Sequence, residues 1–581
     1  MSVPTATGEP LALSAGDLLP LRPWRRAQEQ PDHASFSRWA DDAWRTITAR
    51  EHLDSLVATT RGLIAAGVAA GDRVALMSDT RYEWLLLDEA IWTAGAGTVP
   101  VYPSSSASQL EWILTDSGAR LLVVETAEQA ATAAGLDLDV EVLVLDDDAV
   151  GTLAERGRDV PEEQVHARRD AVTFDDLAGI VYTSGTTGRP KGVVLTHRHL
   201  ASEVAGLLAH PIGTVASDGQ RVLMFLPMAH VLARSVAYTA AQGGATIGFW
   251  SDFSSIVDKF ATFRPHMVLG VPRVFEKVHS GIRAKAAGSP VSARVFGLGE
   301  RVAIAWSKAK GDDPHQGRPG PGLRLAHAVF DRLLNAKVRG ALGGECWYAI
   351  SGGGALDPRL GHFFRGVGVP IHEGYGLTES CAAITVNGPG CQRIGTVGRP
   401  IPGNEVRIAD TGEIEIRGAV VTDGYWGNET ATREAIVDGW FATGDLGSLD
   451  DEGYLTITGR AKEIIVTAGG KNVVPGPLED VLRQHPAVSH AMVLGEGRPF
   501  VSALLTLDPQ ATPPADPQTQ FQPLVDKANE LVSKAEGIKV YRVLDEDFTE
   551  ESGELTATQK MRRHVIEERH RDVIEQIYSR R

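Results

Sequence analysis

The chain contains, at residues 182–192, the stretch Tyr182-Thr-Ser-Gly-Thr-Thr-Gly-Arg-Pro-Lys-Gly192. Short apolar runs at 180–181 and 193–195 flank it and are typical of strands. Its three glycines permit tight backbone turns, so that consecutive N–H groups can converge on phosphate oxygens, while the hydroxyl and cationic side chains add donors. It is not a Walker A loop, because Lys191 is followed by Gly192 and not by Ser or Thr. The stretch predicts a phosphate-binding loop; the alternative is a flexible surface hairpin.

Composition limits the classes of function. The 581 residues carry a net charge of −17, which argues against a bulk electrostatic grip on nucleic acid or on an anionic membrane. Three cysteines without a CxxC pair make a disulfide framework or a structural zinc site a poor interpretation. The N-terminus lacks the basic and apolar regions of a secretory signal. We therefore expect a cytoplasmic protein that does not bind nucleic acid.

Strand-like and helix-like segments alternate in the first half of the chain. Apolar runs at 73–77, 98–102 and 121–124 are separated by helix-like segments at 82–96 and 106–117, a βαβαβ series that predicts a parallel sheet covered on both faces. The charged stretch at 146–174 is interpreted as a surface loop. A period-2 pattern at 404–416 is typical of antiparallel strands, and an amphipathic helix is predicted at 521–535 in a smaller C-terminal unit.

The 182–192 stretch closely resembles the phosphate loop of the adenylate-forming enzymes, which include acyl-CoA synthetases, luciferases and the adenylation domains of peptide synthetases. The resemblance implies an α/β fold: a large N-terminal domain of parallel-sheet layers plus a small β-barrel-like region, and a small, mobile α+β C-terminal domain. The implied boundaries are 1–459, a hinge at 460–462, and 463–581. The implied phosphate-binding residues are Thr183, Ser184, Gly185, Thr186, Thr187, Gly188 and Lys191.

Two glycine-rich segments, 351–355 and 373–379, extend the resemblance. In the family they frame adenine, which implies nucleotide contacts for Gly352, Gly353, Gly354, Gly374, Tyr375 and Gly376. Thr378 can donate to the α-phosphate, and Glu379 is the single hard carboxylate that Mg²⁺ accepts beside phosphates and water. Taken alone, the second segment could be an ordinary turn with an exposed glutamate.

The segment 438–447 is similar to the fatty acyl-CoA synthetase signature. The resemblance assigns Asp445 and Arg460 to the ribose, and Lys462 to the pivot on which the small domain turns between an adenylating and a thioester-forming pose. It also places Gly469, Gly470 and Lys471 on the path of the CoA thiol in the second pose. Without the resemblance, Asp445 could cap a turn and 459–463 would be only a charged linker.

Lys560 matches the family lysine that bridges the substrate carboxylate and the α-phosphate. An ammonium group there offsets the repulsion between a carboxylate and a polyphosphate. The chain departs from most relatives in carrying Ala557 where they have proline, which affects the stiffness of this loop. His230, in the segment 225–231, would lie beside the acyl pocket, although it could equally be a core histidine.

The segments 225–231 and 271–277, with a helical insertion at 281–344, are similar to bacterial long-chain fatty acyl-CoA synthetases. The implied reaction activates a fatty acid with ATP and Mg²⁺ and transfers the acyl group to CoA, with ATP and CoA as co-substrates. One alternative is an enzyme that passes a different acyl-adenylate to a carrier protein; another is a non-catalytic module that binds a nucleotide or acyl-CoA. The sequence leaves peripheral membrane contact and a homodimer open.

Overall fold

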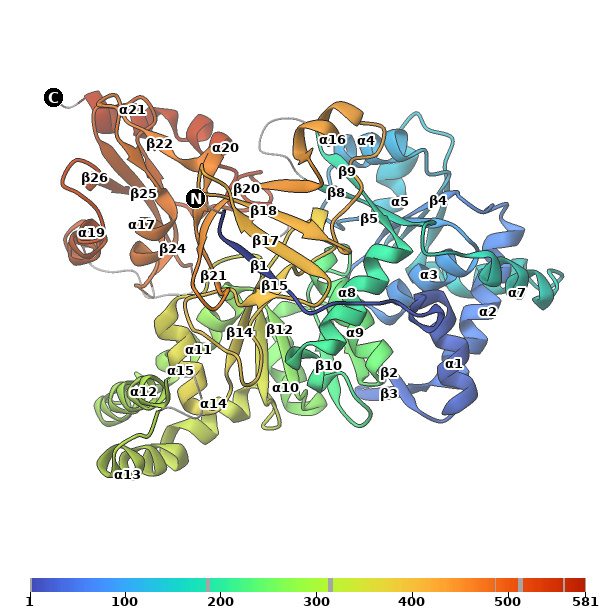
Figure 1. Ribbon diagram of the computed structural model, residues 1–581, viewed down its shortest axis with the longest axis horizontal. Helices are drawn as coiled ribbons and strands as arrows, with labels where there is room; N and C mark the ends of the chain where they lie inside the picture. Colours follow the sequence, from blue (N-terminus) through green and yellow to red (C-terminus); the bar gives the residue numbers. More distant parts are fainter. Residues whose placement is uncertain are drawn as a thin grey trace.

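The computed structural model describes residues 3–183, 189–311, 317–485, 487–509, 516–556 and 560–579 (Figure 1). The predicted contacts of Ser184, Gly185, Thr186, Thr187 and Gly188, and the effect of Ala557, therefore lie outside the described residues. A large N-terminal region holds three sheets and a small C-terminal region packs beside them. None of the helices in the described ranges combines the length and the apolar character needed to cross a bilayer.

The predicted parallel sheet is confirmed, and it includes the two strands that flank the predicted phosphate loop. Its strand order is β7-β6-β4-β5-β8-β9, parallel except for the final β8–β9 hairpin, with helices α3 (Tyr82–Thr93), α4 (Ala107–Ser117) and α5 (Ala127–Ala134) in the connections. The strands are β4 (Arg73–Met77), β5 (Gly97–Val101), β6 (Leu121–Val124), β7 (Glu141–Val144), β8 (Leu177–Thr183) and β9 (Lys191–Thr196).

The interpretation of 146–174 as an irregular loop is wrong. This stretch forms α6 (Ala149–Arg156) and α7 (Glu162–Ala171), and α6 packs against α2 (Ala49–Ala65). Each helix buries a single large apolar residue, Leu153 or Val165, and exposes mostly charged side chains. With so little apolar periodicity, the charged faces concealed the helical pattern.

A second, nine-stranded sheet has the order β16-β15-β14-β13-β12-β10-β11-β2-β3. Its central strands run parallel, and α8 (His197–Ala209) and α9 (Val231–Gly243) pack together between this sheet and the first one. The strands are β2 (Ala34–Ala40), β3 (Ala43–Thr48), β10 (Arg221–Met224), β11 (Thr246–Phe249), β12 (Met267–Gly270), β13 (Tyr348–Ser351), β14 (Ile371–Tyr375), β15 (Thr385–Val386) and β16 (Arg399–Pro400).

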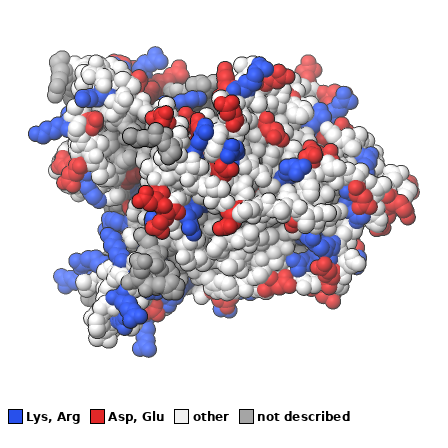
Figure 2. Space-filling view, viewed as in Figure 1, with Lys and Arg blue, Asp and Glu red and all other residues white. Residues whose placement is uncertain are grey.

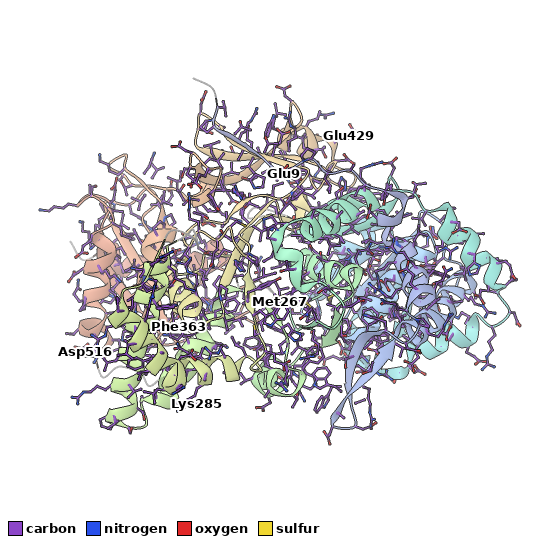
Figure 3. All side chains as sticks on the ribbon, turned by 60° about the horizontal axis from the view of Figure 1, so that its bottom comes forward. Glu9, Met267, Lys285, Phe363, Glu429 and Asp516 are labelled. Carbon is purple, nitrogen blue, oxygen red and sulfur yellow. The ribbon has the colours of Figure 1, made fainter. Side chains whose placement is uncertain are left out.

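The helical insertion lies between β12 and β13 of this sheet. It forms α11 (Pro272–Ala286), α12 (Pro290–Lys310), α13 (Pro321–Phe330), a π-helical turn at Asp331–Asn335, and α14 (Ala336–Ala341). Helix α12 packs against α15 (Pro358–Val367), with the Phe296 and Phe363 rings 6.3 Å apart. In Figure 3, Met267 lies in the interior of the large domain, whereas Lys285 of the insertion lies at the edge of the molecule.

The antiparallel region expected after residue 404 is confirmed as a six-stranded sheet. Strands follow the order β1-β17-β18-β20-β19, and β21 pairs with β20. They are β1 (Thr5–Thr7), β17 (Asn404–Ile408), β18 (Glu413–Gly418), β19 (Ile436–Val437), β20 (Trp440–Leu449) and β21 (Leu455–Arg460).

The small C-terminal region has its own core. Strands β24 (Val488–Leu494), β25 (Val501–Leu507) and β26 (Ile538–Val543) form a mixed sheet that packs against α17 (Pro475–Leu482) and α19 (Gln522–Asn529). The helix predicted at 521–535 is shorter than expected and ends at Asn529. The side chain of Asn529 binds the backbone N–H and C=O of Ile538, which stabilises the chain after the helix in a non-helical path. Two further helices, α20 (Arg563–Arg569) and α21 (Arg571–Ser579), follow.

Candidate active site

One large cavity, of about 2400 Å³, lies where the sheets of the large domain meet the small domain. Its wall includes residues from β8, β9, β13, β14, β20, β21 and the loop before α20. The predicted site residues that line it are Thr183, Lys191, His230, Gly352, Gly353, Gly354, Gly374, Tyr375, Gly376, Thr378, Glu379, Asp445, Arg460, Lys462 and Lys560. Residues separated by almost 380 positions therefore share one wall.

The Asp445 carboxylate is held from two sides. Asp445 and Arg460 are directly paired in the β20–β21 ladder, and Arg460 Nε lies 2.9 Å from Asp445 Oδ1. The Tyr375 hydroxyl donates to Asp445 Oδ2 at 2.7 Å. Burial, followed by the charge of Asp445, raises the pKa of Tyr375 well above its ordinary value, so this hydroxyl remains a donor. A fixed carboxylate of this kind suits a ligand that presents hydroxyl donors.

Glu379 is positioned by a residue that the sequence reasoning missed. It lies in a short 3₁₀ turn, Thr378–Ser380, and its Oε1 accepts a hydrogen bond of 2.9 Å from the Tyr425 hydroxyl. The Lys191 Nζ lies 5.0 Å from the centre of the same Tyr425 ring, which links Glu379 to β9, the strand that follows the predicted phosphate loop. The next residue, Trp426, donates its N–H to the Gly192 carbonyl at 2.7 Å, a contact that brings Tyr425 to this strand and that no local sequence pattern indicates.

The donor set fits magnesium better than a metal held by protein alone. In the described ranges, no three His, Cys, Asp or Glu residues are grouped so that they could hold a metal ion. Glu379 is instead one carboxylate at the cavity wall, close to Thr378 and to the phosphate-loop strands. Mg²⁺ is commonly bound by one or two carboxylates together with substrate phosphates and water. Glu379 is therefore the residue that would hold it.

The glycine segments bring backbone close to the cavity. At Gly376 a Cβ atom would lie 1.6 Å from the Ala382 carbonyl oxygen, and Gly353 has a φ of +78°, so neither position accepts a side chain. Glu373, at the start of the second glycine segment, is another cavity residue that the sequence did not identify. Burial raises the pKa of Glu373 to about 7, although its carboxylate accepts from the Leu356 N–H at 3.1 Å.

His230 caps the N-terminus of α9 and faces the cavity. Its Nδ1 accepts from the Leu232 N–H at 3.1 Å, which places the ring proton on Nε2. Burial lowers the pKa of His230 to about 4, and the nearby Lys560 charge acts in the same direction. The imidazole is therefore neutral near pH 7 and can donate one hydrogen bond into the cavity.

Lys560 enters the cavity from the small domain. A short antiparallel bridge between Leu555 and Met561 forms the base of its loop. Desolvation by the surrounding protein lowers the pKa of Lys560 and Arg460 adds to this effect, whereas the carboxylates of Asp445, Glu463 and Glu379 oppose it. The ammonium group thus lies within electrostatic range of both Asp445 and Glu379, and of His230 at the entrance to α9.

Comparison with known proteins identifies the family. The family model described as AMP-binding enzyme matches residues 23–426, and the model of the AMP-binding enzyme C-terminal domain matches residues 462–581. The chain is 45% identical to the long-chain-fatty-acid–CoA ligase FadD15 of Mycobacterium tuberculosis, over 98% of each chain. The chain belongs to the AMP-binding enzyme family.

Solved structures of AMP-binding enzymes share its fold. MatB from Rhodopseudomonas palustris, bound to ATP, superposes with a TM-score of 0.72 at 25% identity, covering 96% of this chain and 99% of MatB. MenE from Bacillus subtilis, in complex with ATP and a magnesium ion, superposes with a TM-score of 0.68 at 22% identity, covering 94% and 98% of the two chains. Enzymes of this family that ligate acids to CoA use ATP, Mg²⁺ and CoA.

Within this AMP-binding enzyme, the predicted hinge and CoA-path residues lie in different places. Lys462 is exposed in the 3₁₀ turn Ala461–Glu463 and lines the cavity, next to Arg460. Gly469, Gly470 and Lys471 form an exposed turn and, in the described chain, do not belong to the cavity wall. The pose that brings Lys560 into the site therefore leaves this turn outside it.

The cavity of this AMP-binding enzyme has a mainly apolar branch along α9, with the hydroxyl groups of Ser235 and Thr239 among its lining. Six α9 residues on one helical face line it, and Met267 and Ile350 of the nine-stranded sheet also belong to the cavity wall. Because α9 rises ~1.5 Å per residue, the ten positions from His230 to Ala240 give the branch a length of roughly 15 Å along the helix. The α9 residues are Val231, Leu232, Ser235, Val236, Thr239 and Ala240.

Proposed function

We propose that this protein is a long-chain fatty acid–CoA ligase that works through an acyl-adenylate. A carboxylate oxygen of the acid attacks the α-phosphorus of ATP, and pyrophosphate leaves with the electrons of the broken P–O bond. The CoA thiolate then attacks the acyl carbonyl carbon, and AMP leaves. The observation that supports this most directly is the single cavity shared by Asp445, Glu379 and Lys560, with an apolar branch beside His230.

The residues divide the work by charge and position. Lys560 and Lys191 would offset the negative charge of the acid and of the phosphates, which otherwise repel each other. Asp445 and Arg460, which form an ion pair with 2.9 Å between Oδ1 and Nε, would bind the ribose. Thr378 would donate to the α-phosphate. Mg²⁺ on Glu379 would supply further charge neutralisation at the phosphates.

The apolar branch supports a long acyl chain over a compact acid. Each buried CH₂ group contributes ~0.8 kcal/mol, so a branch roughly 15 Å long rewards chain length in a way that a small aryl acid cannot use. The 45% identity to FadD15, whose name specifies long-chain fatty acids, agrees with this choice. We propose that the enzyme acts in the cytoplasm, where ATP and CoA are available.

The alternative is transfer of the acyl-adenylate to a carrier protein. Lys471 in the predicted thiol path favours CoA, whose phosphates a lysine can bind. Two assays separate the candidates. Acid-dependent exchange of labelled pyrophosphate into ATP reports adenylation, and CoA-dependent release of AMP reports thioester formation.

We expect both activities with hexadecanoate, weaker activity with hexanoate and very little with benzoate. Exchange without CoA-dependent AMP release would favour the carrier-protein reading. A preference for benzoate would contradict the long-chain assignment.

A further inference from the structure

The helices α12 and α13 of the insertion carry unusually exposed apolar side chains. Val291 and Leu325 expose 73% and 70% of their surface, and Leu298, Val329 and Leu333 expose 45–49%. These helices project from the large domain at the lower left of Figure 1. The packed side of α12 is supplied by other residues, including buried Phe296, so the fold does not require apolar side chains on the outer face.

The spacing of these residues makes α13 an amphipathic surface helix. Leu325, Val329 and Leu333 recur every four residues, which places them on one outer stripe that continues into the π-helical turn. Arg324 and Arg332 come one position before Leu325 and Leu333, so two cations lie beside the apolar stripe. A helix with this pattern lies in the interface of a bilayer with its apolar side inserted.

The charge of the insertion is opposite to that of the whole protein. Residues 281–344 contain eleven Lys and Arg but four Asp and Glu, a net +7 in a chain of net −17. The two acids in the described part of the insertion are paired: Glu300 lies 3.4 Å from Arg359, and Asp331 lies 2.8 Å from Arg339. Figure 2 shows blue and white atoms, with little red, over this projection.

The cations beside the apolar stripe remain available to a partner. Arg324, Arg332 and Lys337 are exposed, and none of them forms an ion pair with any residue that the structure describes. On α12, Arg294, Arg301 and Lys308 repeat every seven residues on its exposed side. Long cationic side chains of this kind reach anionic headgroups while their stems cover apolar surface.

We propose that this α12–α13 surface, formed by Val291, Leu298, Leu325, Val329 and Leu333 with the surrounding Arg and Lys residues, docks on an anionic lipid bilayer. Charge complementarity selects an anionic partner, and the apolar stripe at helical spacing selects one with an apolar interior over a folded acidic protein. Docking would hold the enzyme at the bilayer, in which a long-chain acid dissolves. This consequence rests on the proposed function, whereas the docking surface does not depend on it.

Co-sedimentation of the full-length protein with vesicles tests the proposal. We expect binding to phosphatidylcholine vesicles that contain phosphatidylglycerol, weaker binding at high salt, and little binding to phosphatidylcholine alone. The triple variant R324Q/R332Q/K337Q should lose on the order of 100-fold in binding, from roughly fivefold per cation. The variant L325S/V329S/L333S should lose binding at low and high salt alike.

Matched controls separate the surface from general effects. R50Q/R120Q/R571Q removes three exposed cations elsewhere, and Leu531→Ser removes an exposed apolar residue on the small domain; both should bind as wild type. Thermal unfolding checks that the test variants fold. The proposal is overturned if the wild type does not bind anionic vesicles, if it binds a polyglutamate matrix instead, or if the test and control variants bind equally. Normal CoA-dependent AMP release in that case would leave the proposed function standing.

Discussion

Lys560 is the residue on which we expect the first chemical step to depend most. Its ammonium group comes from the small domain, while the carboxylates that stabilise its charge, Asp445 and Glu379, come from the large one. A charge positioned before the reaction begins stabilises the transition state without further reorganisation. Asp445 is positioned in the same way, because Tyr375 and Arg460 hold its two oxygens.

Replacing Lys560 by Ala should therefore separate the two half-reactions. We expect pyrophosphate exchange to fall by about 10²–10³-fold, the usual effect of removing one preorganised charge-stabilising group. Thioester formation from supplied acyl-adenylate should stay within a few-fold of wild type. Lys539→Ala, an exposed lysine of the same domain, is the control. Equal loss of both half-reactions would show that Lys560 does not act in the first step.

The buried carboxyl group of Glu203 should make the stability of the protein depend on pH. It is fully buried on α8, and its Oε1 accepts from the Ser235 hydroxyl and the Ala383 N–H, each at 2.9 Å. Burial raises the pKa of Glu203 to about 8, against ~4.3 in an unfolded chain. Between these values the folded state holds a proton that the unfolded state has released, so this group makes stability fall as pH rises.

Glu203→Gln should remove that pH dependence, because the amide keeps a polar group of the same shape without ionising. We expect the Tm of the variant, relative to wild type, to rise between pH 5 and pH 8.5. Exposed Glu128→Gln should show no such trend. A Tm difference that does not change with pH would mean that Glu203 is ionised in the folded protein.

At the scale of elements, the turn Ala461–Glu463 connects β21, which carries Arg460, to the small domain. Lys462→Pro should fix φ near −65° at the centre of this turn. The present pose, in which Lys560 reaches the cavity, should persist, and pyrophosphate exchange should stay near wild type. CoA-dependent AMP release should fall at least tenfold, whereas Lys462→Ala should have little effect. Survival of both half-reactions in the proline variant would argue against rotation at this turn.

Elements with strong periodicity were predictable, and those held by tertiary contacts were not. The strands at 73–77 and 121–124 and the antiparallel strands after 404 match their apolar patterns. Helices α6 and α7 were not predicted because each buries only one large apolar residue, and α19 ends earlier than predicted because the Asn529 side chain binds the Ile538 backbone. Sheet order, such as β11 beside β2, joins residues some 210 positions apart and leaves no local signal.

The candidate site was predictable where a motif carries its chemistry. Asp445, Glu379 and Lys560 were assigned through resemblance, and the structure places them on one cavity wall. Tyr425 and Glu373 were missed, because a residue that positions another can be recognised only once the fold brings the two together. The roles assigned to Lys462 and to the turn 469–471 remain predictions.

At the scale of the whole molecule, the small domain is held against the large one by contacts of Arg273, a residue of the cavity wall. Arg273 of α11 donates to the Ser489 hydroxyl at 3.2 Å and lies 3.5 Å from Asp508, both on the small domain. These contacts belong to the pose in which Lys560 enters the site. They would have to break for the small domain to turn.

Arg273→Ala should therefore weaken the first half-reaction alone. A partly exposed charged contact contributes ~1 kcal/mol, so we expect pyrophosphate exchange to fall about fivefold. Thioester formation from supplied acyl-adenylate should be unchanged or faster. Lys285→Ala, on the exposed side of the same helix, should match wild type in both assays. A slower second half-reaction would show that Arg273 stabilises the thioester-forming pose and not the adenylating one.

The central claim is that residues from both domains surround one nucleotide, and a crystal structure with AMP and hexadecanoate tests it most directly. We expect the ribose on Asp445 and Arg460, the base beside Tyr375 and Gly353, the phosphate near Thr378 and Lys560, and the acyl chain along α9. Nucleotide bound away from Asp445 and Glu379, or an acyl chain outside the α9 branch, would contradict the account.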